Sequence, residues 1–91
     1  MKVSHEFILR EIAGEYLLVP VGRAAAQFNG LITMNETART IFLALNEERT
    51  VEELTALVTA EYEVDADTAR ADVEEFVDQL RQVGALVERG A

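Results

Sequence analysis

The side chains most often used for catalysis are scarce in this chain. His5 is the single histidine and Ser4 the single serine, and the 91 residues include no cysteine. A nucleophilic serine needs a base held in rigid geometry, which two neighbouring residues of an N-terminal tail do not provide. The lack of cysteine excludes disulfides, thiolate zinc sites, iron–sulfur clusters and cysteine nucleophiles. We therefore expect no nucleophilic catalysis.

Carboxylates are abundant, and one run of them is spaced in a way that is typical of metal loops. Acidic residues alternate from Glu61 to Asp67. A calcium-binding EF-hand loop needs Gly at its sixth position and Glu at its twelfth, where this chain has Ala66 and Asp72. The chain also has no glycine-rich phosphate loop. We expect no metal, no cofactor and no enzyme activity.

Composition and charge limit the class of protein further. The chain is 49% hydrophobic and 27% charged, as expected for one folded domain spanning residues 1–91. Its net charge of −9 opposes binding to nucleic acid and to anionic lipid. The first residues contain no signal peptide, and no apolar run is long enough to cross a membrane. We expect a cytoplasmic location.

The elements that would position any site change character near residue 35. Short β-rich runs predict strands at 7–12, 15–21 and 31–34, the first two forming an antiparallel hairpin. Residues 22–30 permit either a small hairpin, closed by the Asn29-Gly30 turn, or a loop. Helical spacing of apolar residues predicts helices at 36–45, 51–62 and 66–83. Residues 86–87 either form a last short strand or pack against the rest of the domain without forming one.

Capping residues support the three helices. Asn35 and Asp65 are favourable N-caps, and Thr50 with Glu53 makes a capping box. Gly84 is suited to end the last helix. Strands grouped before helices predict an α+β domain, here a winged-helix-like fold with a small three-stranded antiparallel sheet followed by three helices. Such folds include both DNA readers and peptide readers. With its cap, the third predicted helix carries more acids than bases, which disfavours DNA.

The junction between strand 31–34 and the first helix resembles that of the PqqD family. Its Leu31-Ile32-Thr33-Met34-Asn35-Glu36-Thr37-Ala38 is similar to the family's hydrophobic strand followed by Leu/Met-Asn-Glu-Thr-Ala/Gly. Segments 7–16, 50–54, 61–65 and 72–87 resemble the family in the same order. The resemblance implies a RiPP recognition element, a domain that binds the leader of a ribosomally made precursor peptide, often beside a radical SAM enzyme. The 22–30 connection is longer than in compact cofactor-biosynthesis members, so we expect a different pathway.

The resemblance also implies that the leader adds as a strand along 31–34, beside the third helix. That segment has no Pro and no charge, so nothing within it blocks pairing at its edge. Its alternate residues should face opposite sides of the sheet, and the sequence does not indicate which pair meets the peptide. A stripe of the third helix is predicted to line an apolar groove there, with its arginines pairing acidic leader residues. The predicted site is Leu31, Ile32, Thr33, Met34, Arg70, Val73, Glu74, Val77 and Arg81.

Two alternatives stay open at this point. A winged-helix-like module can bind another folded protein in place of a leader. In that case the stripe on the third helix has no role in binding a leader. Val77 then widens the core face, and Arg70 and Arg81 are solvated. A free strand edge also permits pairing between two copies of the chain, or a domain-swapped dimer.

Overall fold

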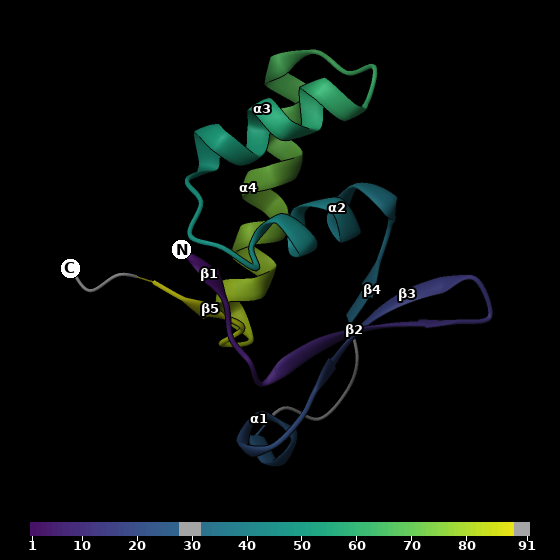
Figure 1. The fold of residues 1–91 in the computed structure, drawn as a ribbon, viewed down its shortest axis with the longest axis vertical. Helices are drawn as coiled ribbons and strands as arrows, with labels where there is room; N and C mark the ends of the chain where they lie inside the picture. The colour runs from purple at the N-terminus through teal and green to yellow at the C-terminus, as the bar shows by residue number, and fades with distance from the viewer. Residues whose placement is uncertain (28–31, 89–91) are drawn as a thin grey trace.

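The computed structural model describes residues 1–27 and 32–88. Its elements alternate between short strands and helices along the chain (Figure 1). In order they are β1 (Lys2–Val3), β2 (Phe7–Ile12), β3 (Glu15–Pro20), α1 (Arg23–Gln27), β4 (Ile32–Met34), α2 (Glu36–Ala44), α3 (Val51–Glu61), α4 (Ala66–Gln82) and β5 (Leu86–Val87). The α+β class, with a three-stranded antiparallel sheet and three main helices, is confirmed.

The predicted elements end within one residue of the observed ones wherever the structure describes them. Leu31, the first residue of the third predicted strand, lies outside the described residues. Two features were not predicted: the helix α1, and the strand β1 in what was interpreted as a tail. β1 pairs antiparallel with β5, so Val3 lies opposite Leu86. The hairpin alternative for 22–30 is wrong at residues 23–27, which are helical, and Phe28 to Gly30 lie outside the described residues.

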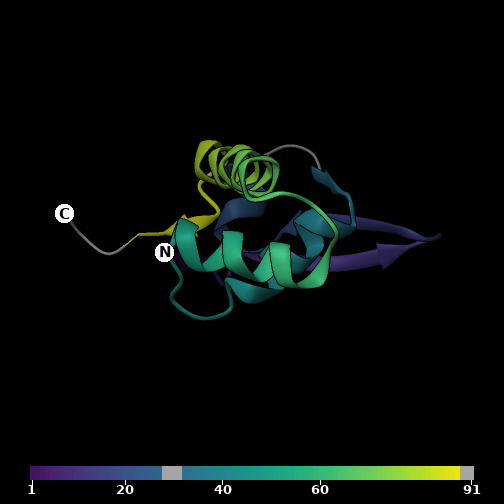
Figure 2. The ribbon, with the colours of Figure 1, turned by 90° about the horizontal axis from the view of Figure 1, so that it is seen from above.

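The three-stranded sheet has the order β2-β3-β4, with both pairs antiparallel. α2, α3 and α4 lie together on one side of it, and the β2–β3 hairpin extends away from them (Figures 1 and 2). α4 contributes more of the core than any other helix, because its apolar residues recur at helical spacing on one face. Its buried residues are Ala69, Val73, Phe76, Val77 and Leu80.

The hairpin between β2 and β3 turns through two residues that both have positive φ. Ala13 has φ 53° and Gly14 has φ 82°, between the paired residues Ile12 and Glu15. Positive φ at both central residues is the geometry of a type I′ turn, which favours Asn-Gly over Ala-Gly. Because an L-residue other than Asn or Asp is strained there, Ala13 reduces the stability of the fold.

Ala13→Asn is expected to stabilise the protein by about 1 kcal/mol, because Asn tolerates the left-handed conformation that strains Ala. Urea unfolding followed by circular dichroism measures the change. Ala60→Asn, on the exposed side of α3, is the control. It should cost about 0.5 kcal/mol, because Asn is a weaker helix former than Ala. Equal effects of the two substitutions would contradict this explanation of the turn.

Side-chain caps begin the three main helices. Asn35 Oδ1 accepts from the Ala38 N–H at 2.8 Å, and Asp65 Oδ1 accepts from the Thr68 N–H at 2.8 Å. Thr50 forms the predicted capping box, accepting from the Glu53 N–H while its own N–H donates to the Glu53 carboxylate. These bonds satisfy amide groups that a helix leaves unpaired at its start, so they fix where each helix begins.

The Asp65 cap predicts a measurable dependence of stability on pH. The hydrogen bonds from the Thr68 backbone and hydroxyl hold the pKa of the Asp65 carboxyl below its usual value of 3.8. A lowered pKa in the folded state stabilises it above the unfolded pKa, and this stabilisation is lost as pH falls below about 4 through the folded pKa. Asp65→Asn should therefore match the wild type at pH 7, since Asn caps equally well, and lose less stability between pH 4 and pH 2. Urea midpoints at these pH values test this. An identical acid loss in both proteins would contradict it.

Candidate functional site

The strand β4 lies at the edge of the three-stranded sheet. It pairs with β3 on one side, placing Leu17 opposite Thr33, and has no strand partner on its other side among the described residues. β2 is the opposite edge of the sheet, but it carries Arg10 and Glu11, and charged residues discourage the addition of another strand. Ile32–Met34 has no charge and no proline. Of the two edges, β4 is the one suited to pairing with an extended peptide.

The side chains of β4 alternate between the core and solvent, which answers a question that the sequence left open. Met34 is 4% exposed and Ile32 is partly buried against the same core, whereas Thr33 is exposed. Ile32 and Met34 therefore face the helices, and Thr33 faces the other side of the sheet. An added strand next to β4 would direct alternate side chains toward the helices.

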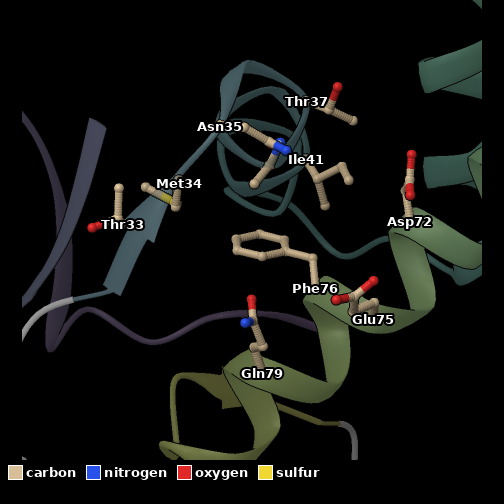
Figure 3. Close-up of a pocket in the computed structure, with 10 residues that line it drawn as sticks. Thr33, Met34, Asn35, Thr37, Ile41, Asp72, Glu75, Phe76 and Gln79 are labelled. Atoms are coloured by element: carbon tan, nitrogen blue, oxygen red, sulfur yellow. The ribbon is translucent and has the colours of Figure 1, made fainter. Parts of the chain in front are cut away.

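A groove lies between β4, the start of α2 and one side of α4 (Figure 3). The ring of Phe76 projects from α4 into the space between Met34 and Ile41. Asp72, Glu75 and Gln79 form the α4 side of the groove, at helical spacing. Its lining residues are Thr33, Met34, Asn35, Thr37, Ala38, Ile41, Asp72, Glu75, Phe76 and Gln79.

The size of this groove limits what it can hold. Its volume is about 240 Å³, below the roughly 300–1,000 Å³ of pockets that enclose a drug-sized ligand or a cofactor. Its floor is apolar, because Met34, Ile41 and Phe76 belong to the hydrophobic core. One or two peptide side chains fit these dimensions, and the edge of β4 beside the groove can hold the peptide backbone.

The stripe of α4 predicted from the sequence lies on the other side of the helix. Val77 is 2% exposed and Val73 is fully buried, so the prediction that Val77 lines an exposed groove is wrong. Both pack in the core, and neither lines the groove beside β4. The groove lies on the flank of Phe76, and the prediction had placed it on the flank of Val77.

Arg70, Glu74 and Arg81 also lie away from the groove, and their charges are already paired. Arg70 approaches Glu52 at 3.4 Å and Glu74 at 3.6 Å. Arg81 approaches Glu88 at 2.7 Å, and this hydrogen bond raises the pKa of Arg81 and lowers that of Glu88. Arg81 also approaches Asp78 at 2.9 Å.

Both arginines are close to half exposed, so these pairs contribute little to stability. These ion pairs nevertheless involve the same two arginines that were expected to pair with acidic leader residues. The structure gives no support to that part of the predicted site.

The residues considered for catalysis have simple structural surroundings. The Ser4 hydroxyl accepts a hydrogen bond from the Glu6 N–H at 3.1 Å, closing a turn before β2. Within residues 1–27 and 32–88, no group of three or more His, Asp or Glu side chains is arranged to hold a metal ion. None of the helices in these ranges is both long and apolar enough to span a membrane.

The fold and the groove define a small winged-helix-like α+β domain with an uncovered sheet edge beside a groove that has an apolar floor. The family model of Coenzyme PQQ synthesis protein D (PqqD) matches residues 15–86, which is most of the chain. The chain belongs to the PqqD family, as its sequence around residues 31–38 indicated.

A solved structure described as TbiB1 in complex with the TbiA(beta) leader peptide has a similar fold. The two chains superpose with a TM-score of 0.75 over 100% of each chain, at 24% sequence identity. No curated protein matches the chain significantly.

Proposed function

We propose that this protein is a non-catalytic adaptor that binds the leader of a ribosomally synthesised precursor peptide by strand addition to β4. The leader is then presented to a modifying enzyme, for which a radical SAM enzyme is the first candidate. The observation that carries the proposal is the uncharged edge of β4 beside a groove with an apolar floor. Membership of the PqqD family supports it, as does the likeness to a fold solved with a leader peptide.

The energetics of this binding mode set a requirement on the leader. Pairing along the three residues of β4 forms about three hydrogen bonds, worth roughly 1 kcal/mol each. Burying one large apolar side chain in the groove adds about 1.5–3 kcal/mol. Micromolar affinity requires about 8.2 kcal/mol. A second apolar contact or a longer paired segment must supply the difference, so the bound leader should extend beyond the groove.

An NMR titration tests the proposal. Isotopically labelled protein is titrated with the synthetic leader of the small precursor encoded nearest to its gene. We expect the largest amide shifts in β4 and on the groove side of α4, with smaller shifts around Arg70 and Arg81. The core segment of the same precursor, without its leader, is the control peptide and should cause no shifts. Shifts that avoid β4 and the groove, or that both peptides cause equally, would contradict the proposal.

A further inference from the structure

The groove carries negative charge, which no cation balances among the described residues that line it. Asp72 and Glu75 are exposed, lie on its α4 side, and take part in none of the ion pairs between described residues. No lysine or arginine is among the residues that line it. Figure 3 shows Glu75 next to Phe76 on α4, and Asp72 further along the same side of the helix. An apolar side chain seated on the floor would therefore share the groove with two carboxylates that have no ion-pair partner among the described residues.

The nearby cations are occupied elsewhere. Arg70 and Arg81 pair with acids on the opposite flank of α4. Arg39, the one cation of α2, lies over the ring of Tyr16 at 5.0 Å from its centre. The charged residues of α4 therefore differ between its two flanks. On the flank of Arg70 and Arg81 they form ion pairs within the protein, whereas on the groove flank Asp72 and Glu75 keep their negative charge.

We infer that the groove prefers a peptide in which a lysine or arginine lies two residues from the anchor, the apolar side chain that sits on the groove floor. This inference rests on the proposed function. In an extended peptide, residues i and i+2 point the same way, about 6.6–6.8 Å apart. Asp72 and Glu75 are neighbours at i and i+3 on the helix, with Cβ atoms about 5–6 Å apart. A cation at i−2 or i+2 can reach these carboxylates while the anchor occupies the floor.

Three synthetic peptides test this preference on the full chain. Each is Ac-Thr-Thr-Xaa-Thr-Phe-Thr-Xaa-Thr-Thr-NH₂, with Lys, Gln or Glu at both Xaa positions. Exposed ion pairs change affinity by a small factor, so the Lys peptide should bind about threefold more tightly than the Gln peptide, and the Glu peptide about threefold more weakly. The differences should shrink in 0.5 M NaCl, because salt screens exposed charges.

Two variants of adjacent residues separate the groove charge from the charge of the whole protein. Glu75→Gln and Glu74→Gln each remove one negative charge from α4, but only Glu75 lines the groove, whereas Glu74 pairs with Arg70. Glu75→Gln should reduce the preference for Lys over Gln to the part that Asp72 supplies, and Glu74→Gln should leave it unchanged. Melting temperatures establish that both variants remain folded.

The inference and the proposed function fail in different ways. If the natural leader binds at β4 but the three peptides bind equally, or if the two variants act alike, the charge preference is overturned and the adaptor function stands. If the Lys peptide causes no shift in the groove at millimolar concentration, the preference is overturned as well. If the natural leader itself does not bind, the adaptor function fails. An advantage for Lys that Glu75→Gln reduces and Glu74→Gln preserves supports the inference.

Discussion

Val77→Asp is expected to destabilise the protein strongly. Val77 is 2% exposed and packs in the core on α4, where a carboxylate would be shielded from water, and the arginines of that flank, Arg70 and Arg81, already pair with acids. A buried charge without a partner costs about 3–5 kcal/mol. Folded proteins have about 5–15 kcal/mol of stability in total, so a large share of it would be lost. Far-UV circular dichroism and a thermal melt measure the loss.

Val64→Asp is the matched control for that variant. Val64 is 37% exposed in the connection before α4, so a carboxylate there stays in water and the melting temperature should hardly change. If Val77→Asp instead folds and melts like the wild type while failing to bind a leader, Val77 faces a groove. The peptide-binding flank of α4 would then be the one that carries Val77, and not the one that carries Glu75.

Gln79→Trp is expected to weaken leader binding by at least tenfold, which corresponds to about 1.4 kcal/mol, with the fold intact. Gln79 is exposed on the α4 side of the groove, beside Phe76. An indole at this position can lie over the apolar floor and occupy the space that the peptide side chain needs. Isothermal titration with the synthetic leader measures the affinity, and a thermal melt establishes that the variant is folded.

Gln82→Trp tests whether this loss is specific to the groove. Gln82 is also exposed and lies one turn further along α4, but it does not line the groove. The same substitution there should leave leader affinity within about twofold of the wild type, as for most surface changes away from a site. Equal losses from both variants would mean that the peptide does not enter the groove beside β4.

The main elements could be predicted from the sequence because each is specified locally. Asn35, Thr50 and Asp65 begin the three helices through bonds to amides three residues ahead, so the sequence places those boundaries directly. The apolar residues of α4 recur with helical period, which reveals its buried face. These signals need no knowledge of distant contacts.

Elements that depend on distant contacts could not be predicted in this way. α1 has five residues, too few for a helix to be stable by itself. It is held by burial of Ala24 and by the Glu6 carboxylate, which accepts from the Arg23 N–H at 3.2 Å. β1 has two residues and forms its ladder with β5, more than eighty positions later. Neither contact leaves a periodic pattern in the sequence.

The main error of the sequence-based prediction at the candidate site was the choice of the flank of α4 that lines the groove. The buried stripe of α4 is bordered on one side by Arg70, Glu74 and Arg81, and on the other by Asp72, Glu75 and Gln79. The sequence shows both borders but not which one faces β4, because that depends on how the helix packs against the sheet and α2. Phe76 belongs to the core and also forms part of the groove floor.

The β1–β5 ladder decides how the domain would respond to a mechanical load applied through its two ends. Lys2 lies opposite Val87, so the chain enters and leaves at the same end of this short ladder (Figure 1). A force that separates the ends would open its bonds one after another, as in unzipping, and would not shear them together. In a tethered or fused arrangement the ladder would therefore yield first, while β4 and its groove, held by other contacts, stay assembled under tension.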